Sequence, residues 1–585
     1  PNGAANIPLQ LVKANPATGM GAMQGMSYIQ RVATMGGIAP ASACAVRKRE
    51  SLAAAPITPK TQATASALAA TDSVADIIAA MCLDPYIGRR SPDEVDFDSI
   101  YDTVAEVVDY FGAEEAGEFG YTFDDTDVSF EETLATVASA IFCRAYRQGR
   151  VIRMTFERAT ENSTLIFNAR NVMPGSQSRT VRFGPLDDHD GVELDYTDPE
   201  DGAALTLAIP ANHLATSARS LEVVGVRSFV LAYWQAWRAW NKVRYQNIAV
   251  ELEATQEAAL VLPQDRVLIA DRTRPGVLQG EVEEEDGTTL TLSHAAPLPG
   301  DGWTIFLQHV DGTVEALGVS AGADDFHVEL ANAPRMALSV DAANFARATY
   351  IIVPEDDVQT RAFLVSEREP NTNFTETVRA VNYSFLYYQH DELVFWIEPK
   401  SAALTDAGPF DRATVAQAGA SVVTDSERGS VFQGTASTSA VTIAGMVAPA
   451  SYTKAAWIKK DALTGNGNIL SSGGSAYEVF WITGGTLGAG HNGSWTAVST
   501  EWPEAGEWHH AAVSYDADDG EMVLYLNGLE VSRAAVASRT LGSLHAFGFG
   551  GGNALVGRGD DLRLWKRALS PTELRAVYLA SKRPA

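Results

Sequence analysis

Residues 506–531, "GEWHHAAVSYDADDGEMVLYLNGLEV", constrain the fold of this chain more than any other stretch. Asp519-Gly520 and Asn527-Gly528 are short turn signals, and Asn-Gly is the strongest sequence signal for a tight hairpin. The residues around these turns are mostly apolar or alternate in polarity, as in strands. The stretch therefore predicts a meander of three antiparallel strands.

The same stretch suggests a metal site, because two histidines lie close to several aspartates. His509 and His510 are consecutive on the predicted strand, so their rings point to opposite faces and cannot bind one metal together. Asp516, Asp518 and Asp519 lack the spacing and the distant glutamate of a helical calcium loop. We therefore interpret the aspartates as part of a hairpin turn and predict no metal site.

The composition limits what class of protein this can be. At 585 residues the chain is too long for one hydrophobic core, and 46% apolar and 20% charged residues are ordinary for folded domains. The net charge of −29 argues against binding of nucleic-acid phosphates, which requires clustered Lys and Arg. The three cysteines lie far apart without metal-ligand spacing and predict buried or free thiols. We expect several folded domains and no nucleic-acid binding.

The N-terminal part of the chain changes character at residue 73. Residues 1–72 are rich in Ala, Gly, Pro, Ser and Thr and predict an extended arm or linker. The segment 73–85 begins with Ser and ends at Pro, with apolar residues at helical spacing between them, and predicts a helix. A second helix is predicted over 129–148, because acidic residues lie in its first turn and basic ones in its last. Residues 149–157 then alternate as a strand.

Residues 151–400 predict mainly short strands, interrupted by one helix at 228–245. Asp-Gly turn signals separate strands at 190–191, 286–287 and 311–312. The helix carries tryptophans every three residues, at Trp234, Trp237 and Trp240. Such a stripe could stack on bases or sugars, but it more often packs a helix against a sheet or a subunit. We expect packing or a subunit contact here.

Beyond residue 407 the composition shifts toward Gly, Ser, Thr and aromatic residues. Helical periodicity is almost absent until 570–581, where a Ser N-cap, a Pro and a first-turn Glu predict a short terminal helix. The residues between predict an all-β domain whose strand number suits two packed sheets. The fold class predicted for the chain is multidomain and mainly β, with α+β domains before a C-terminal two-sheet β-sandwich.

The C-terminal part resembles the laminin-G-like, concanavalin-A-like jelly-roll family over residues 407–581. The meander of 506–531, the early strand "YTKAAWIKK" and the closing "GRGDDLRLWKRALSPTELRAVY" together carry the resemblance. The residues that fit the closing motif in order are Gly557, Asp561, Leu562, Leu564, Ala568, Leu569, Ser570, Glu573 and Tyr578. The resemblance implies a carbohydrate- or protein-binding module, in a family where some members hold calcium.

A Gly-rich loop of the predicted sandwich offers the best candidate for ligand binding. The sequence "GHNGSWT" places His491, Asn492 and Trp495 where an aromatic platform on an exposed loop would meet a glycan. Packing of Trp495 onto a neighbouring strand explains the loop equally well. We expect no cofactor, although the jelly roll could hold calcium.

The same sandwich fold also occurs in glycosidases, which need two carboxylates beside the scissile bond. Those enzymes carry Glu-x-Asp-x-x-Glu on one strand, and no such string follows residue 407. The nearest imitation, "ELDYTD" with Glu193, Asp195 and Asp198, precedes the sandwich. The sequence also has no nucleophile elbow, phosphate-binding loop, zinc motif or dinucleotide fingerprint. We predict no catalytic residues and no enzymatic activity.

Residues 73–400 resemble the tail-tip, or host-specificity, proteins of long-tailed bacteriophages, also called baseplate hub proteins. Each matching segment is a common helix–strand or strand–turn pattern, but the segments follow the family's order. They include "DIIAAMCLDPYIGRRSPDEVDFDSI", "NVMPGSQSRTVRF", "DGVELDYTDPE", "AWNKVRYQNIAVELEATQEAALVLPQDRVLIAD" and "FLVSEREPNTNFTETVRAVNYSFLYYQHDE". The first hub portion could be short, divergent or supplied by another chain, because residues 1–72 show little pattern.

The second resemblance implies a trimeric hub that closes the distal end of a tail tube and carries host-recognition domains at its C-terminus. It divides the chain into an arm with or without part of a hub domain (1–72), an α+β hub domain (73–250), a β-rich, barrel-like hub domain (251–400) and the jelly roll (407–585). The implied partners are two further copies of the chain, the distal-tail, tape-measure and tail-tube proteins, and a host surface glycan or outer-membrane receptor.

The location implied by the resemblance is the tail tip of the virion, after synthesis in the host cytoplasm. The alternative hypothesis is a tail enzyme that degrades surface polysaccharide from the same position.

Overall fold

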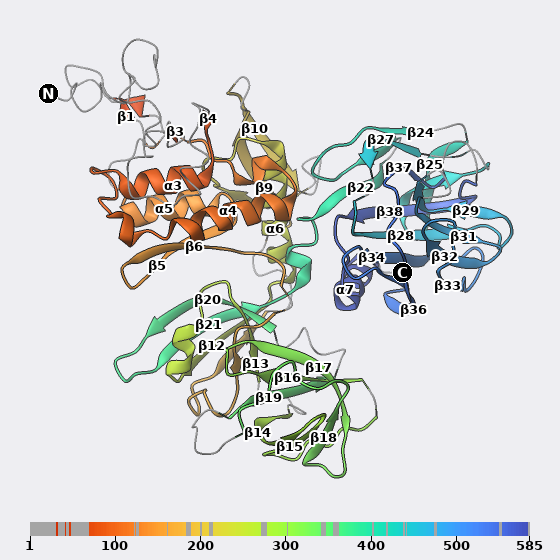
Figure 1. Cartoon of the computed structure of the whole chain (residues 1–585). Helices are drawn as coiled ribbons and strands as arrows, with labels where there is room; N and C mark the ends of the chain where they lie inside the picture. The colour runs from red at the N-terminus through yellow and green to blue at the C-terminus, as the bar shows by residue number, and fades with distance from the viewer. Residues whose placement is uncertain are drawn as a thin grey trace.

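The computed structural model describes residues 70–582, with internal gaps, and three short strand segments before them. The earlier segments are 31–32, 41–42 and 46–47, and the gaps are 122, 124–127, 161, 183–188, 199–201, 210–214, 271–277, 301, 341–346, 355–361, 401–402, 417–418, 437–438, 440, 448, 473–476 and 549–552. The predicted arm over 1–72 therefore lies almost wholly outside the described residues. Figure 1 shows a helical part, a barrel part and a sandwich, which meet near α6 (Phe229–Tyr245) and β22 (Leu393–Lys400).

The helical part packs helices against a hairpin and a small sheet, around buried residues that include Phe111, Ile141 and Trp234. Its other helices are α3 (Val74–Leu83), α4 (Phe97–Phe111) and α5 (Phe130–Ser139). Its strands are β5 (Cys143–Gln148), β6 (Val151–Phe156), β9 (Gly191–Thr197), β10 (Ala204–Ile209) and β11 (Ala218–Leu221). The helices predicted over 73–85 and 228–245 and the strand within 149–157 are confirmed, whereas α4 was not predicted.

The helix predicted over 129–148 is too long. It ends at Ser139, Phe142 takes a positive φ of 60°, and the following residues form β5. β5 pairs antiparallel with β6 across a turn at Gly149 and Arg150. Pairing with β6 satisfies the backbone groups of the segment, so a contact with a later strand overrides its local helix preference.

The barrel part consists of a six-stranded sheet and a closed barrel of six strands inserted between two strands of that sheet. The sheet contains, in spatial order, β7 (Ile166–Phe167), β13 (Arg266–Ile269), β20 (Ala362–Pro370), β21 (Glu376–Asn382), β12 (Ile248–Ala254) and β8 (Ser178–Val181). The barrel contains β14 (Leu278–Asp286), β15 (Thr289–Leu292), β16 (Trp303–Gln308), β17 (Val314–Ala321), β18 (His327–Leu330) and β19 (Thr349–Pro354). The turns predicted at 286–287 and 311–312 join barrel strands.

The domain boundary predicted between residues 250 and 251 lies inside β12, a strand of the six-stranded sheet. The sheet also takes strands from both sides of that boundary, so the predicted boundary divides one sheet.

The sandwich has a long sheet that faces two shorter ones across a buried core containing Phe480, Leu487, Val513 and Leu562. The main path of the long sheet is β23 (Ala403–Asp406), β22, β38 (Gly557–Trp565), β28 (Tyr452–Lys460), β34 (His509–Asp516), β35 (Glu521–Leu526) and β36 (Leu529–Ala535), with β26 (Gly429–Gly434) and β25 (Ala420–Asp425) beside β38. One short sheet is β24 (Thr414–Ala416), β27 (Val441–Val447), β37 (Ser543–Ala546) and β30 (Leu470–Ser472); the other is β29 (Asn466–Asn468), β31 (Val479–Thr483), β32 (Thr486–Gly490) and β33 (Val498–Glu501).

The predicted fold class, mainly β and multidomain with a C-terminal jelly-roll sandwich, is confirmed. The terminal helix is α7 (Pro571–Ser581), whose N-cap Ser570 and Glu573 form a capping box. The sandwich begins earlier than residue 407, because β22 pairs with β38 in the middle of the long sheet.

The meander predicted over 506–531 is confirmed by the pairing of β34 with β35 and of β35 with β36. Asn527 and Gly528 both take positive φ, 52° and 76°, as a tight hairpin turn requires. His510 is 1% exposed and lies edge-on to Trp457, whereas His509 meets the side chain of Asn527 through Nδ1 at 3.2 Å. The two histidines therefore have separate surroundings.

Helix α6 and the segment before β22 form a buried junction between the helical part and the sandwich. Arg238 donates to both carboxylate oxygens of Asp391 at 2.7–3.0 Å, and the two side chains are 3% and 0% exposed. The guanidinium of Arg238 lies 4.0 Å from the ring centre of Phe142. Trp237 stacks on His390 with ring centres 4.0 Å apart. The tryptophan stripe of α6 packs as expected, and it holds the chain just before β22 against the helical part.

Candidate binding face of the jelly roll

The loop between β32 and β33 contains the three residues predicted to contact a ligand, and the first of them is buried. His491 is 1% exposed; its Nε2 lies 2.9 Å from the hydroxyl of Tyr452 and its Nδ1 3.1 Å from the carbonyl of Ala537. Burial lowers the pKa of His491 to about 4, so the ring is neutral at pH 7. His491 anchors the loop from inside the sandwich, and a ligand on the surface does not reach its ring.

Asn492 and Trp495 lie on the surface of the loop. Asn492 has a positive φ of 53°, and its side-chain amide donates to the carbonyl of Ser538 at 2.6 Å. This bond ties the loop to the segment after β36, so the amide nitrogen of Asn492 is already engaged. Trp495 is 39% exposed and presents the largest apolar surface of the loop.

Trp481 on β31 lies beside Trp495 and was missed by the sequence prediction. The two rings meet edge to face with centres 5.8 Å apart, and the Nε1 of Trp481 donates to the carbonyl of Trp495 at 3.2 Å. Phe480 and Ile482 are 0% exposed in the core, so the alternation of β31 turns Trp481 outward. That alternation is the sequence signal that could have identified Trp481.

Small and polar side chains surround the tryptophan pair on the outer face of this sheet. Gly488 of β32 lies opposite Trp481, and a Cβ at Gly488 would come within 2.9 Å of the side chain of Thr496. Glycine at this position therefore lets the loop that carries Trp495 lie over β32.

Two residues further along the strands, and so on the same face, a polar row crosses the sheet. Its members, in register, are Asn466, Thr483, Thr486 and Glu501. The hydroxyl of Thr483 already donates to the Oδ1 of Asn466 at 2.6 Å, and Glu501 is exposed. An exposed indole face beside hydroxyl, amide and carboxylate groups can pack against a sugar ring and bond its hydroxyls.

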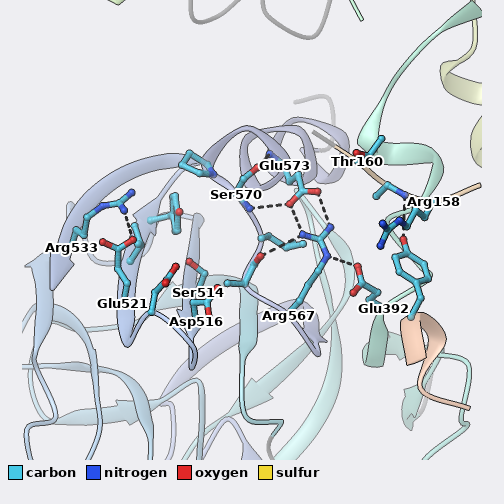
Figure 2. Close-up of a pocket in the computed structure, with 18 residues that line it drawn as sticks. Arg158, Thr160, Glu392, Ser514, Asp516, Glu521, Arg533, Arg567, Ser570 and Glu573 are labelled. Carbon is cyan, nitrogen blue, oxygen red and sulfur yellow. Dashed lines mark hydrogen bonds and ion pairs between the residues drawn. The ribbon is translucent and has the colours of Figure 1, made fainter. Parts of the chain in front are cut away.

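A polar cavity of about 450 Å³ lies elsewhere, between β34–β36, the start of α7 and the helical part. Figure 2 shows that Arg567 reaches both Glu392 and Glu573 and that Arg533 reaches Glu521. These charges already have partners across the cavity walls. All three ion pairs lie within the sandwich or directly before its strand β22, and Asp516 and Asp519 also line the cavity.

Among the described residues, no group of three or more His, Cys, Asp and Glu side chains gathers as a metal site would require. Calcium in the jelly roll stays an untested expectation. Within the same described ranges, no helix has the length and apolar character needed to cross a membrane.

Comparison with known families identifies the sandwich. Residues 433–575 match the family model described as the concanavalin A-like lectin/glucanases superfamily. The C-terminal domain is a concanavalin-A-like jelly roll. Residues 1–55, nearly all outside the described part of the chain, match a family described as protein of unknown function (DUF3455). A search of the curated proteins finds no match.

Several solved structures are similar to part of this chain at low sequence identity. The receptor binding domain of botulinum neurotoxin D is 15% identical, covering 33% of this chain and 53% of that one, with a TM-score of 0.28. The serotype D ligand binding domain in complex with N-acetylneuraminic acid is also 15% identical, covering 33% and 51%, with a TM-score of 0.28. The binding domain of Paraclostridial Mosquitocidal Protein 1 is 14% identical, covering 33% and 52%, with a TM-score of 0.29. The chain thus spans about half the length of these domains.

Proposed function

We propose that this chain is an attachment protein whose jelly roll binds a surface glycan on the face formed by Trp481, Trp495 and the adjacent polar row. The observation that carries the proposal is the outward Trp481–Trp495 pair, beside hydroxyl, amide and carboxylate groups in register on one sheet. A single face of this kind can bind a glycan weakly and still attach a particle, because several linked copies raise the overall avidity.

The assembly that we propose is the tail-tip hub of a long-tailed bacteriophage, a homotrimer that carries the jelly roll at its distal end. The ordered sequence resemblance over 73–400 supports this proposal. The buried Arg238–Asp391 ion pair also supports it, because a jelly roll that attaches a particle to a host must be held firmly to the rest of the chain. The distal-tail, tape-measure and tail-tube proteins would be its partners, and the virion tail tip its location.

We propose binding without hydrolysis as the chemistry of the sandwich. In the cavity of Figure 2, Glu392, Glu521 and Glu573 pair with arginines, which leaves Asp516 and Asp519 as the lining carboxylates to replace first in a test for hydrolysis. Shortening of a host polysaccharide by the purified chain, lost on replacing carboxylates within 407–585, would favour the depolymerase alternative.

The attachment proposal is tested by adding the fluorescently labelled chain to bacterial cells before and after periodate oxidation of their surface sugars. Binding that is lost on oxidation supports a glycan receptor, and unchanged binding contradicts it. The hub is tested separately by the mass in solution: a trimer of 62.5 kDa chains supports it, and a stable monomer contradicts it. Imaging of labelled chains on phage particles would locate the protein.

A further inference from the structure

The stretch of chain that carries the Trp481–Trp495 face has charge of one sign only. Residues 461–532 contain ten Asp and Glu residues and no Lys or Arg, so all 44 basic residues of the chain lie outside this stretch. The stretch includes the whole sheet of β29, β31, β32 and β33 and the loop of Trp495. The strands and the loop that form the face therefore contribute no positive charge to it.

Glu501 is the acidic residue that lies on the face itself. It ends β33, is exposed, and stands opposite Thr486 on the outer side of the sheet, where Trp481 also lies. Leu487 and Val498 point into the core, and alternation along their strands fixes this direction. Glu501 is two strands across from Trp481 and two residues along, so their Cα atoms lie roughly 12 Å apart. A short oligosaccharide that packs on the indole rings therefore reaches the carboxylate.

The described part of the chain offers Glu501 no ion-pair partner. Lys460 is 1% exposed, and its Nζ donates to a backbone carbonyl at 3.3 Å. Lys454 and Arg539 lie inside the sandwich, where both pair with Glu478. Arg533 pairs with two glutamates and lines the cavity of Figure 2, on the other side of the long sheet. None of these four cations is free to pair with an acidic group of a glycan on the face.

The charge of a glycan therefore decides how it meets this face. Recognition of an acidic sugar requires a cation or several donors aimed at its carboxylate, as an arginine provides in a bidentate pair. On this face an acidic group would instead approach Glu501, and the two negative charges repel each other. A neutral sugar meets no such cost. An amino sugar gains from the carboxylate and also from the indole rings, which attract cations.

We propose that the Trp481–Trp495 face binds glycans without carboxylate, phosphate or sulfate groups, and that Glu501 sets this preference. The inference rests on the proposed glycan attachment and names the class of glycan that the same face selects. Glu501 acts as a specificity residue, because its charge opposes acidic glycans while the tryptophans supply the contact surface.

The test applies the full chain to an array that presents neutral oligosaccharides beside their acidic counterparts, such as lactose with sialyllactose and galactotriose with trigalacturonate. Each neutral glycan that is bound should bind about threefold or more better than its acidic counterpart at low salt. The difference should shrink at about 0.5 M salt, because exposed charges are then screened.

Charge-changing variants assign the preference to one residue. Glu501→Lys should raise the binding of the acidic counterparts at least fivefold, and Glu501→Gln should have a smaller effect in the same direction. Glu284→Lys makes the same charge change at an exposed strand residue of the barrel, so it is the matched control and should leave the preference unchanged.

Two outcomes would overturn the inference and leave glycan attachment in place. The first is binding that Trp481→Ala abolishes but that is equal or stronger for the acidic counterparts. The second is a preference for neutral glycans that Glu501→Lys does not change. If the array shows no bound glycan, or if Trp481→Ala does not weaken binding, the proposed attachment face fails and this inference fails with it.

Discussion

Two groups of tryptophans in this chain differ in what lies beside them, although Trp237 and Trp481 are both half-buried. On α6, Trp234 is fully buried and Trp237 lies flat on His390. On the sandwich, Trp481 and Trp495 meet edge to face, and the neighbours of Trp481 on the sheet are glycine and polar residues. The difference is what covers the rings. An aromatic side chain covered by its own chain stabilises the fold, whereas an uncovered one beside hydrogen-bonding groups is available to a ligand.

The largest effect is expected at the buried junction that the α6 tryptophans enclose. Asp391→Ala should lower the free energy of unfolding by about 3–5 kcal/mol, because Arg238 would stay buried without its counterion. Urea unfolding followed by tryptophan fluorescence measures this. Glu131→Ala is the control, since it removes an exposed ion pair with Arg147 and should change stability by less than about 1 kcal/mol. Similar small losses in both variants would contradict the role of the junction.

Trp234→Ala and Trp481→Ala compare the two tryptophan groups directly. Trp234→Ala should cost about 3–5 kcal/mol, because it leaves a cavity in the helical core. Trp481→Ala should cost clearly less, because its half-buried ring lies on the outer face of a sheet and packs mainly against Trp495. Thermal unfolding of the two variants gives the comparison, and a larger loss for Trp481→Ala would show that this side chain serves packing.

Acid should weaken the jelly roll between pH 6.5 and pH 4. Burial lowers the pKa of His491 from 6.5 to about 4, so in this window the unfolded chain takes up a proton that the folded chain does not. The stability contributed by the neutral ring is complete above pH 6.5 and falls as pH falls, by about 3 kcal/mol at pH 4. His510, with a pKa that burial lowers to about 3, adds a further loss over the same window and continues it below pH 4.

His491→Gln measures that contribution. Urea unfolding at pH 7 and at pH 4 should show a smaller difference in this variant than in the parent chain. An identical pH dependence in the two chains would mean that other groups, such as carboxylates, cause the acid sensitivity.

Features with local sequence signals were predicted well. The meander follows from Asp-Gly and Asn-Gly turns, and α6 and α7 follow from Ser caps and helical spacing. Signals of this kind need no knowledge of distant partners. Trp481 was missed although it has such a local signal, because its outward direction follows from the burial of Phe480 and Ile482 on either side of it.

Three other errors arose from contacts distant in sequence. β5 is a strand because β6 pairs with it, and β22 belongs to the sandwich because β38, near the end of the chain, lies beside it. His491 is buried by Tyr452 and Ala537, which are 39 and 46 residues away. Residues 492–496, which follow it, are exposed, so the loop sequence did not distinguish it from a surface histidine.

The central claim is that the Trp481–Trp495 face binds a glycan, and affinity for purified surface polysaccharide of a bacterium to which the chain attaches tests it most directly. Trp481→Ala and Trp495→Ala should each weaken binding at least tenfold, about 1.4 kcal/mol, with little change in unfolding temperature. Tyr86→Ala, which removes an aromatic ring that is 80% exposed in the helical part, should bind like the parent chain. Equal affinity in all four proteins would contradict the claim.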